Sequence, residues 1–327
     1  MPAPALSVVI PVRDEVAHLP GTIDALLTAL DGSGFDAEIV LVDDGSSDGS
    51  ADVARAAVDM RVPLSVVRCG GEGRFAARRA GLEAATGELA LLLDARVELE
   101  PTALRFLHER AGAGETVWNA HVHVDTESSF GVFWGLLASL AWRDYFDNPR
   151  TTSFGEEDFD RFPKGTTCFL APRKLLLSAF SGFETHYRDI TLANDDTPIL
   201  RTVARSSRIR ISPEFACRYA PRTTLARFFR HAVHRGAVFL DGHGTPESRF
   251  FPAVVAFFPL SAAVALVSFR RPSVVPATLA ACGLAAGAYG LQAGRSRREV
   301  QVLATVTPIY AVGHGLGMWR GLFELLR

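Results

Sequence analysis

The 327-residue chain is poor in cysteine and in lysine, and each shortage excludes a class of protein. Its four cysteines lie far apart and form no C-x-x-C pair, which argues against a zinc site and against a disulfide framework. The only lysines are Lys164 and Lys174, and no glycine-rich loop with a lysine lies near the N-terminus, which disfavours a nucleotidyltransferase. With 34 Lys and Arg against 36 Asp and Glu, the net charge of −2 argues against nucleic acid as a partner.

The N-terminal segment lacks the pattern of a signal peptide. Residues 1–10 contain no basic group, and Pro11 interrupts the apolar stretch too early. The absence of paired cysteines also favours a reducing compartment. We therefore expect the N-terminal domain to lie in the cytosol.

Short apolar runs alternate with amphipathic segments up to about residue 93. This alternation is typical of a parallel sheet with crossover helices and predicts an α/β fold. The predicted strands are residues 7–12, 38–43, 64–69 and 88–93. One predicted helix places Ile23, Leu26, Leu27 and Leu30 on its apolar face, a second begins near Ser50, and a third covers residues 74–85. Residues 117–218 are mixed in character and predict no clear order of elements.

Three uncharged, mainly apolar runs lie near the C-terminus, at residues 250–269, 273–293 and 302–319. A helix needs about 20 such residues to cross a bilayer. The runs predict a transmembrane region of three helices, which agrees with the mean hydropathy of +0.15. The alternative is a very apolar helical subdomain of a soluble protein, or a re-entrant hairpin.

Residues 222–240 predict an amphipathic helix just before the first apolar run. Apolar side chains such as Phe228 and Val233 fall on one side, and cations such as Arg230 and Arg235 largely on the other. Such a helix can lie in the plane of the lipid headgroups, with its cations near lipid phosphate. An ordinary surface helix is the alternative.

Polar and acidic segments follow all of the predicted N-terminal strands. In open α/β sheets, ligands bind outside the carboxyl ends of the strands. Ionised groups are costly there unless they meet water, a cation or a hydrogen-bonding ligand. The segments are PVRDE at residues 11–15, VDDGSSD at 42–48, CGGEGR at 69–74 and DAR at 94–96. They predict a ligand site at this edge of the sheet.

The same segments resemble the head of the family-2 glycosyltransferases, inverting enzymes with the GT-A fold. The resemblance is carried by SVVIPVRDE at residues 7–15, EIVLVDDGSSDGS at 38–50, GRFAARRAG at 73–81 and LLLD at 91–94. It continues more weakly through GTTCF at 165–169 and GFE at 182–184. It implies a Rossmann-like, nucleotide-diphospho-sugar transferase domain over residues 1–221. An amphipathic interfacial helix and linker would follow over residues 222–249, and transmembrane helices over 250–327.

The resemblance assigns nucleotide-binding roles to residues of the first two segments. It implies that Pro11, Arg13 and Glu15 line the nucleotide pocket. Asp43 and Asp44 would accept hydrogen bonds from the base and the ribose of a nucleotide-sugar. No organic cofactor is implied.

The resemblance also implies a site for the diphosphate. Arg78 or Arg79 would lie near the base or the diphosphate, or would only cover a helix surface. Asp94 matches the first acid of the family's Asp-x-Asp motif, whose acids meet the ribose and a divalent metal, but the second acid is Arg96 here. Arg96 could replace the cation and hydrogen-bond the diphosphate. Alternatively, Mg²⁺ or Mn²⁺ could still bind through Asp94, Glu98 and the donor's oxygens, or catalysis could have been lost.

Asp195 and Asp196 stand where the family has its Glu-Asp base motif, so the resemblance implies that Asp196 is the general base. The alternative is an ordinary pair at a helix N-terminus ahead of Pro198. The Gln-x-x-Arg-Trp motif of processive members is missing, which argues for addition of a single sugar. Arg230 and Arg235 could meet a diphosphate, either that of the donor or that of a polyprenyl carrier.

Together these features predict a multi-pass enzyme of the plasma membrane with a cytoplasmic catalytic domain. It would move one sugar, with inversion, from a nucleotide-sugar to a lipid-linked or membrane-proximal acceptor in cell-envelope or exopolysaccharide synthesis. Arg96 raises the alternative of a catalytically silent homologue that acts as a membrane-bound binding or scaffold subunit.

Overall fold

The computed structural model describes residues 6–246, 248 and 250–326. Outside the described part lie residues 1–5, 247 and 249. Residues 1–5 belong to the N-terminal segment in which no signal peptide was predicted, and residues 247 and 249 belong to the predicted linker. The chain divides into two compact units. The first, called the sheet unit, consists of the chain up to Val124, Ala141–Glu184 and Asp195–Ala220. The second, called the helical unit, consists of Asp125–Leu140, Thr185–Asn194 and the chain from Pro221 onward.

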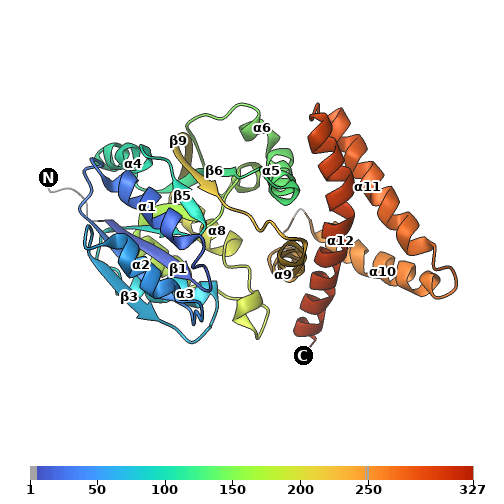
Figure 1. Cartoon of the computed structure of the whole chain (residues 1–327). Helices are drawn as coiled ribbons and strands as arrows, with labels where there is room; N and C mark the ends of the chain where they lie inside the picture. Colours follow the sequence, from blue (N-terminus) through green and yellow to red (C-terminus); the bar gives the residue numbers. More distant parts are fainter. Residues whose placement is uncertain (1–5, 247, 249, 327) are drawn as a thin grey trace. The chain divides into compact units, whose positions relative to one another are not determined.

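Within the described residues, the sheet unit contains one mixed sheet of nine strands (Figure 1). Its first half is parallel, in the spatial order β3-β2-β1-β4. These strands are β1 Leu6–Val12, β2 Ala37–Asp43, β3 Leu64–Arg68 and β4 Leu89–Leu93. They confirm the predicted strands to within one residue at each end. β1 and β4 are buried along their whole length, as expected for strands covered on both faces.

The second half of the sheet comes largely from the region whose elements the sequence did not predict. β8 pairs antiparallel with β4, and the sheet continues through β6 and β9 to β5, with β7 also paired to β9. The strands are β5 Val97–Leu99, β6 Trp118–Val124, β7 Thr152–Phe154, β8 Cys168–Pro172 and β9 Ile209–Tyr219.

The three predicted crossover helices are present. They are α1 Leu19–Leu30, α2 Ser50–Val58 and α3 Arg74–Ala84. The other helical elements of the sheet unit are α4 Ala103–Gly112, α6 Arg143–Phe146, the 3₁₀ turn η1 Phe159–Arg161, α7 Arg173–Ser181 and α8 Thr197–Ser206.

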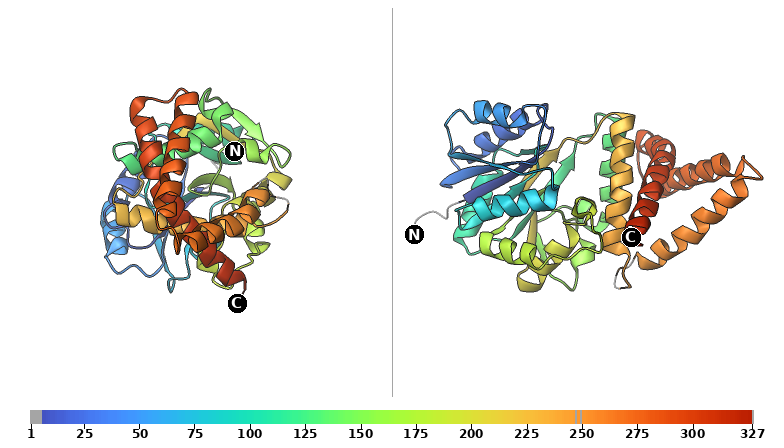
Figure 2. Two further views of the ribbon diagram at one scale, coloured as in Figure 1. Left: turned by 90° about the vertical axis from the view of Figure 1, so that its right-hand side faces the viewer. Right: turned by 90° about the horizontal axis from the view of Figure 1, so that it is seen from below.

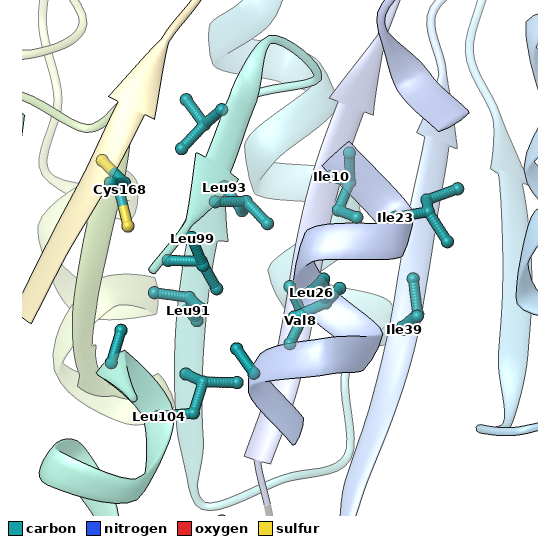
Figure 3. Packing of buried hydrophobic residues seen from close by; sticks show 14 of the residues in the cluster. Val8, Ile10, Ile23, Leu26, Ile39, Leu91, Leu93, Leu99, Leu104 and Cys168 are labelled. Atoms are coloured by element: carbon teal, nitrogen blue, oxygen red, sulfur yellow. The ribbon is translucent and has the colours of Figure 1, made fainter. Parts of the chain in front are cut away.

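The main core lies where α1 and α4 cover one face of the sheet (Figure 3). Val8 and Ile10 of β1 belong to one buried cluster with Ile23 and Leu26 of α1. The apolar face that the 3.6-residue spacing predicted for α1 is therefore the face that it buries.

Helix α3 lies very close to the opposite face of the sheet. A Cβ atom at Gly81 would collide with the side chains of Val9 and Val42, so only glycine permits this approach. The contact fixes α3 against β1 and β2. Its first turns, which carry Arg74 and Arg78, are thereby held at the edge where the strands end.

The helical unit contains α5 Ser129–Ala141, the 3₁₀ turn η2 Ile190–Leu192, α9 Leu225–His243, α10 Phe251–Ser268, α11 Val274–Gln292 and α12 Arg297–Leu325. α9 confirms the helix predicted ahead of the first apolar run. α12 packs along α9 and α11 (Figure 2).

Two helices among the described residues, α10 and α11, are long and apolar enough to cross a membrane. They coincide with the first two apolar runs. The third run forms the middle of α12, a helix of 29 residues that begins with a capping box between Ser296 and Glu299.

Candidate active site at the carboxyl edge of the sheet

The loops that follow β1 and β2 are hydrogen-bonded to each other. The backbone N–H of Asp14 donates to Ser46 Oγ over 3.2 Å, and that of Glu15 donates to Ser50 Oγ over 3.0 Å. Because β1 and β2 are parallel neighbours, both loops leave the same edge of the sheet. The polar segments after these strands therefore meet there.

Asp44 shapes the loop that leads into α3. Its carboxylate is buried, and its two oxygens accept the backbone N–H groups of Glu72, at 2.8 Å, and Gly73, at 2.9 Å. The guanidinium of Arg13 lies 3.9 Å away and is about half exposed. Both Asp44 oxygens are thus used by the protein backbone, whereas Arg13 extends toward solvent.

Asp43 lines a polar cavity of about 320 Å³ at the same edge. One of its oxygens accepts the backbone N–H of Ser46 at 2.8 Å, and Arg68 and Cys69 form part of the wall. Burial, together with nearby carboxylates, raises the pKa of the Cys69 thiol, so this cysteine stays protonated. The cavity therefore offers a carboxylate acceptor and a cation rather than a nucleophile.

Arg78 is the centre of a buried ionic cluster. Its side chain is 1% exposed, and its guanidinium lies 2.7 Å from Asp94 Oδ1 and 2.7 Å from Asp195 Oδ2. Asp196 Oδ1 lies 3.5 Å from the same guanidinium, and Arg74 lies 3.8 Å from Asp195. Residues from α3, the end of β4 and the start of α8 are joined in this way. We call this group the Arg78 cluster.

In the Arg78 cluster, desolvation and the attraction between opposite charges shift the pKa values in opposite directions. Desolvation opposes the charge of Arg78, but Asp94 and Asp195 stabilise it more strongly, so its pKa lies above the ordinary arginine value. The pKa of Asp195 is raised because burial outweighs the attraction of Arg78 and Arg74. Three carboxylates share two guanidinium groups, which leaves one excess negative charge when all are ionised. The cluster therefore attracts a proton or a further cation.

Asp196 is the most exposed acid of the cluster. Its side chain is 31% exposed, against 18% for Asp94 and 4% for Asp195. It is the N-cap residue of α8 and accepts a hydrogen bond from the Thr166 hydroxyl. The helix N-terminus that the sequence offered as an alternative is thus present at the cluster itself. Thr166 was not predicted, and its only signal was the weak resemblance of residues 165–169.

Arg96 forms a second ionic contact at this edge. Its Nε donates to Glu15 Oε1 at 2.7 Å, and the two side chains are 10% and 14% exposed. Another Arg96 nitrogen donates to the backbone carbonyl of Ala220 at 3.4 Å. Arg96 therefore ties the loop after β4 to the loop after β1 and to the end of β9.

The other predicted residues are not among the partners named in these contacts. Pro11 is buried within β1. Arg79 pairs with Glu83 on the exposed surface of α3, as its alternative reading expected. Arg230 and Arg235 are exposed on α9, in the helical unit.

The sheet edge just described lies within a segment that matches a known family. Residues 7–169 match the family model described as Glycosyl transferase family 2. This segment is the part of the chain that belongs to the family. The family resemblance predicted from the strand-end motifs is thereby confirmed.

Curated proteins similar to this chain include undecaprenyl-phosphate 4-deoxy-4-formamido-L-arabinose transferases. That of Aeromonas hydrophila subsp. hydrophila is 39% identical over 114 residues, which are 34% of this chain and 35% of the relative. That of Pseudomonas fluorescens is 35% identical over 142 residues, which are 43% of this chain and 42% of the relative. The chain thus spans less than half the length of these relatives.

Solved structures confirm the predicted fold of this chain. Residues 1–349 of S. aureus TarS in complex with UDP-GlcNAc have a TM-score of 0.51 and 14% identity, covering 94% of this chain and 92% of that one. The mannosyltransferase PcManGT from Pyrobaculum calidifontis, in complex with GDP-Man and Mn²⁺, has a TM-score of 0.56 and 18% identity, covering 94% and 87%. At such identities the likeness establishes the GT-A fold alone.

The residues at this edge do not fit the divalent metal that the Asp-x-Asp motif implies. Of the two acids named as possible ligands, Asp94 is bonded to Arg78, and Glu98 pairs with Arg218 at 2.9 Å. In the described part of the chain, no group of three or more His, Cys, Asp or Glu side chains could hold a metal ion. A hard divalent cation needs several oxygen ligands, whereas the carboxylates of Asp94 and Glu98 are paired with arginines.

Proposed function

We propose that this family 2 glycosyltransferase moves one sugar, with inversion, from a nucleotide-sugar to a lipid-linked acceptor such as a polyprenyl phosphate. The observation that carries the proposal is the convergence of Asp94, Asp195 and Asp196 on buried Arg78 at the carboxyl edge of the sheet. The acceptor class is supported by relatives named as undecaprenyl-phosphate transferases. Cell-envelope or exopolysaccharide synthesis is the corresponding process.

Asp196 is the proposed general base. The acceptor oxygen attacks the anomeric carbon, the bond from that carbon to the diphosphate oxygen breaks, and the nucleoside diphosphate leaves. Asp196 takes the proton that the attacking acceptor phosphate carries as its monoanion. Its partial exposure gives an acceptor access, and its Oδ1 lies 3.5 Å from the Arg78 guanidinium. Asp195, behind it and nearly buried, holds Arg78 in place.

Positive charge for the departing diphosphate is proposed to come from arginine. Arg78 is too deeply buried to leave its acids, but Arg74 is 47% exposed at the edge of the same cluster. A guanidinium can donate two parallel hydrogen bonds to a phosphate group. Arg13, also half exposed, would line the nucleotide pocket near Asp43 and its cavity.

The proposed location is the plasma membrane, with residues 1–221 as a cytoplasmic catalytic domain and 250–327 as the transmembrane region. Leu260, Leu266 and Leu284 on α10 and α11 are 65%, 71% and 74% exposed. Exposed apolar side chains on helices of spanning length support contact with lipid. Residues 222–249, including α9, would form the interfacial helix and linker, with Arg230 and Arg235 available to a carrier phosphate.

Replacement of the base tests the proposal directly. In detergent-solubilised full-length protein, Asp196→Asn should lower turnover by about 10²- to 10⁴-fold, because the amide cannot accept the proton. Binding of the nucleotide-sugar should change little. The measurements are product release from UDP-GlcNAc and GDP-Man with undecaprenyl phosphate as acceptor, and nucleotide-sugar binding by thermal shift.

Asp144→Asn is the matched control, because Asp144 is a highly exposed acid of the sheet unit. It should leave both turnover and binding unchanged. A wild-type protein whose melting temperature responds to no nucleotide-sugar in a broad panel would contradict the proposal.

A catalytically silent scaffold subunit is the second candidate. Arg96 in place of the second motif acid favours it, because that acid meets the metal in the resembling family. This candidate predicts nucleotide-sugar binding without turnover.

A further inference from the structure

We propose that Asp241, on helix α9, is a positioning residue for the general base. Its carboxylate holds both ends of the segment Thr185–Asn194, and the chain continues from Asn194 directly into Asp195 and Asp196. The inference rests on the proposed function only in taking Asp196 as the base.

Three hydrogen bonds from this segment end on the Asp241 carboxylate. Oδ1 accepts the hydroxyl of Thr185 at 3.0 Å and the backbone N–H of His186 at 3.1 Å. Oδ2 accepts the backbone N–H of Asn194 at 2.8 Å. The first two donors open the segment and the third closes it. One carboxylate therefore ties the two ends of a loop together, which reduces the freedom of the residue that precedes the catalytic pair.

The position of Asp241 would be costly without these donors. It is 7% exposed and lies in the last turn of α9, which ends at His243. A negative charge is unfavourable near a helix C-terminus, and burial adds a desolvation cost. Hydrogen bonds to an ionised acceptor are stronger than those between neutral groups and offset both costs. The carboxylate is thus matched to the segment that it holds.

A second contact fixes the middle of the same segment independently. The buried hydroxyl of Tyr187 donates to the backbone carbonyl of Ala237 at 2.8 Å. Ala237 lies one turn before Asp241 on α9, so the two contacts share a helix face. Tyr187→Phe therefore removes a buried hydrogen bond from the same segment while leaving the bond to Asn194 intact, which makes it the matched control.

Asp241→Asn is the informative change because it keeps the shape of the side chain and replaces one acceptor oxygen by an N–H donor group. The amide has one oxygen acceptor and one N–H donor group, whereas the site presents donors to both oxygens. With its oxygen toward Thr185 and His186, the amide keeps their two bonds and loses the bond to Asn194. The end of the segment next to the base is then released.

Two measurements on the full chain in detergent test the inference. Hydrogen exchange at the Asn194 amide should become at least about 10-fold faster in Asp241→Asn and stay unchanged in Tyr187→Phe. With UDP-GlcNAc or GDP-Man as donor and undecaprenyl phosphate as acceptor, kcat should fall by about 10²-fold in Asp241→Asn. The KM for the donor should change by less than about 3-fold, because donor contacts remain. Tyr187→Phe should keep kcat within about 3-fold at a similar loss of melting temperature.

An equal loss of kcat in both variants would overturn the inference, since Asp241 would then act only through stability. Unchanged exchange at Asn194 in Asp241→Asn would also overturn it. If the wild type turns over neither donor, the proposed function fails on these probes, while exchange still decides whether Asp241 holds the segment.

Should Asp241→Asn fail to fold, Gly242→Ala provides a second approach. A Cβ atom at Gly242 meets the side chain of Asn194, so this substitution displaces the same end of the segment. Alanine is the better helix former, so α9 itself should persist. The same selective loss of kcat is expected, and an unchanged kcat would count against the inference.

Discussion

Two ionic contacts lie at the sheet edge, the Arg78 cluster and the Arg96–Glu15 pair. They differ in how many acids the arginine contacts and in how deeply it is buried. Arg78 is almost fully buried and contacts three carboxylates that come from distant parts of the chain. Arg96 is slightly more exposed and contacts one acid from a neighbouring loop. The residue that occupies the motif position is therefore not the one that gathers the acids. A cation supplied by α3 does so instead.

This difference bears on how the site manages negative charge. A buried carboxylate is costly unless a cation or hydrogen bonds compensate for its lost hydration. In the Arg78 cluster, the buried guanidinium compensates for the lost hydration of Asp94 and Asp195, while Asp196 stays partly exposed. In the Arg96–Glu15 pair, one acid is neutralised by one base. Substitutions at the two arginines should therefore have unequal effects.

Loss of Arg78 should have the largest effect. Arg78→Met leaves Asp94 and Asp195 without their main buried partner, and breaking such a contact costs about 3–5 kcal/mol in the free energy of unfolding. Turnover should be lost as well, because Asp196 loses its neighbour. Denaturant unfolding and product release measure the two effects. Arg79→Met, on the exposed surface of the same helix, should change the unfolding free energy by less than about 0.5 kcal/mol. Similar losses of unfolding free energy in Arg78→Met and Arg79→Met would show that the buried contacts of Arg78 contribute no more to stability than the surface pair of Arg79.

Loss of Arg96 should have a smaller effect that responds to metal. Arg96→Asp removes a cation and places a second acid beside Glu15, so turnover should fall by about 10²-fold. Added Mn²⁺ should restore part of it, since the new acid and the diphosphate of the donor supply oxygen ligands. Turnover of the wild type should be insensitive to EDTA. A variant that gains activity from an inactive wild type would instead favour the silent homologue.

The buried imidazole of His121 should make the stability of the protein depend on pH. His121 is buried against the Tyr145 hydroxyl, and burial, together with the charge of His123, lowers its pKa to about 4. An unfolded histidine titrates near pH 6.5, so protonation favours unfolding between these values. The neutral, buried imidazole therefore contributes on the order of 2–3 kcal/mol to the free energy of unfolding. This contribution is complete above pH 6.5 and is lost as the pH falls toward 4.

Denaturant unfolding at pH 7 and pH 4.5 measures this contribution. His121→Gln keeps a polar partner for Tyr145 and cannot titrate, so its unfolding free energy should fall less than that of the wild type. Equal falls would show that burial does not suppress the charge of His121. The contrast with Arg78, whose carboxylate partners keep it charged, would then disappear.

The parallel half of the sheet could be predicted because its signals are local. Each strand is a short apolar run, and each crossover helix repeats its apolar residues within a few turns. The strands β6, β8 and β9 could not be predicted in the same way. Cys168 pairs with Leu93, and Val124 pairs with Tyr219, so these strands are defined by partners far away in the sequence. The local pattern carries little information about such pairings.

The sequence by itself determined that acids stand at the ends of the parallel strands, because strand ends and chain order follow from local periodicity. Only the tertiary structure decided which arginine joins them. The bonds of Arg78 to Asp94 and Asp195 span 16 and 117 positions of the chain. They form because Gly81 lets α3 lie close to the sheet and because Asp195 and Asp196 directly precede α8. Packing of this kind depends on all of these elements at once.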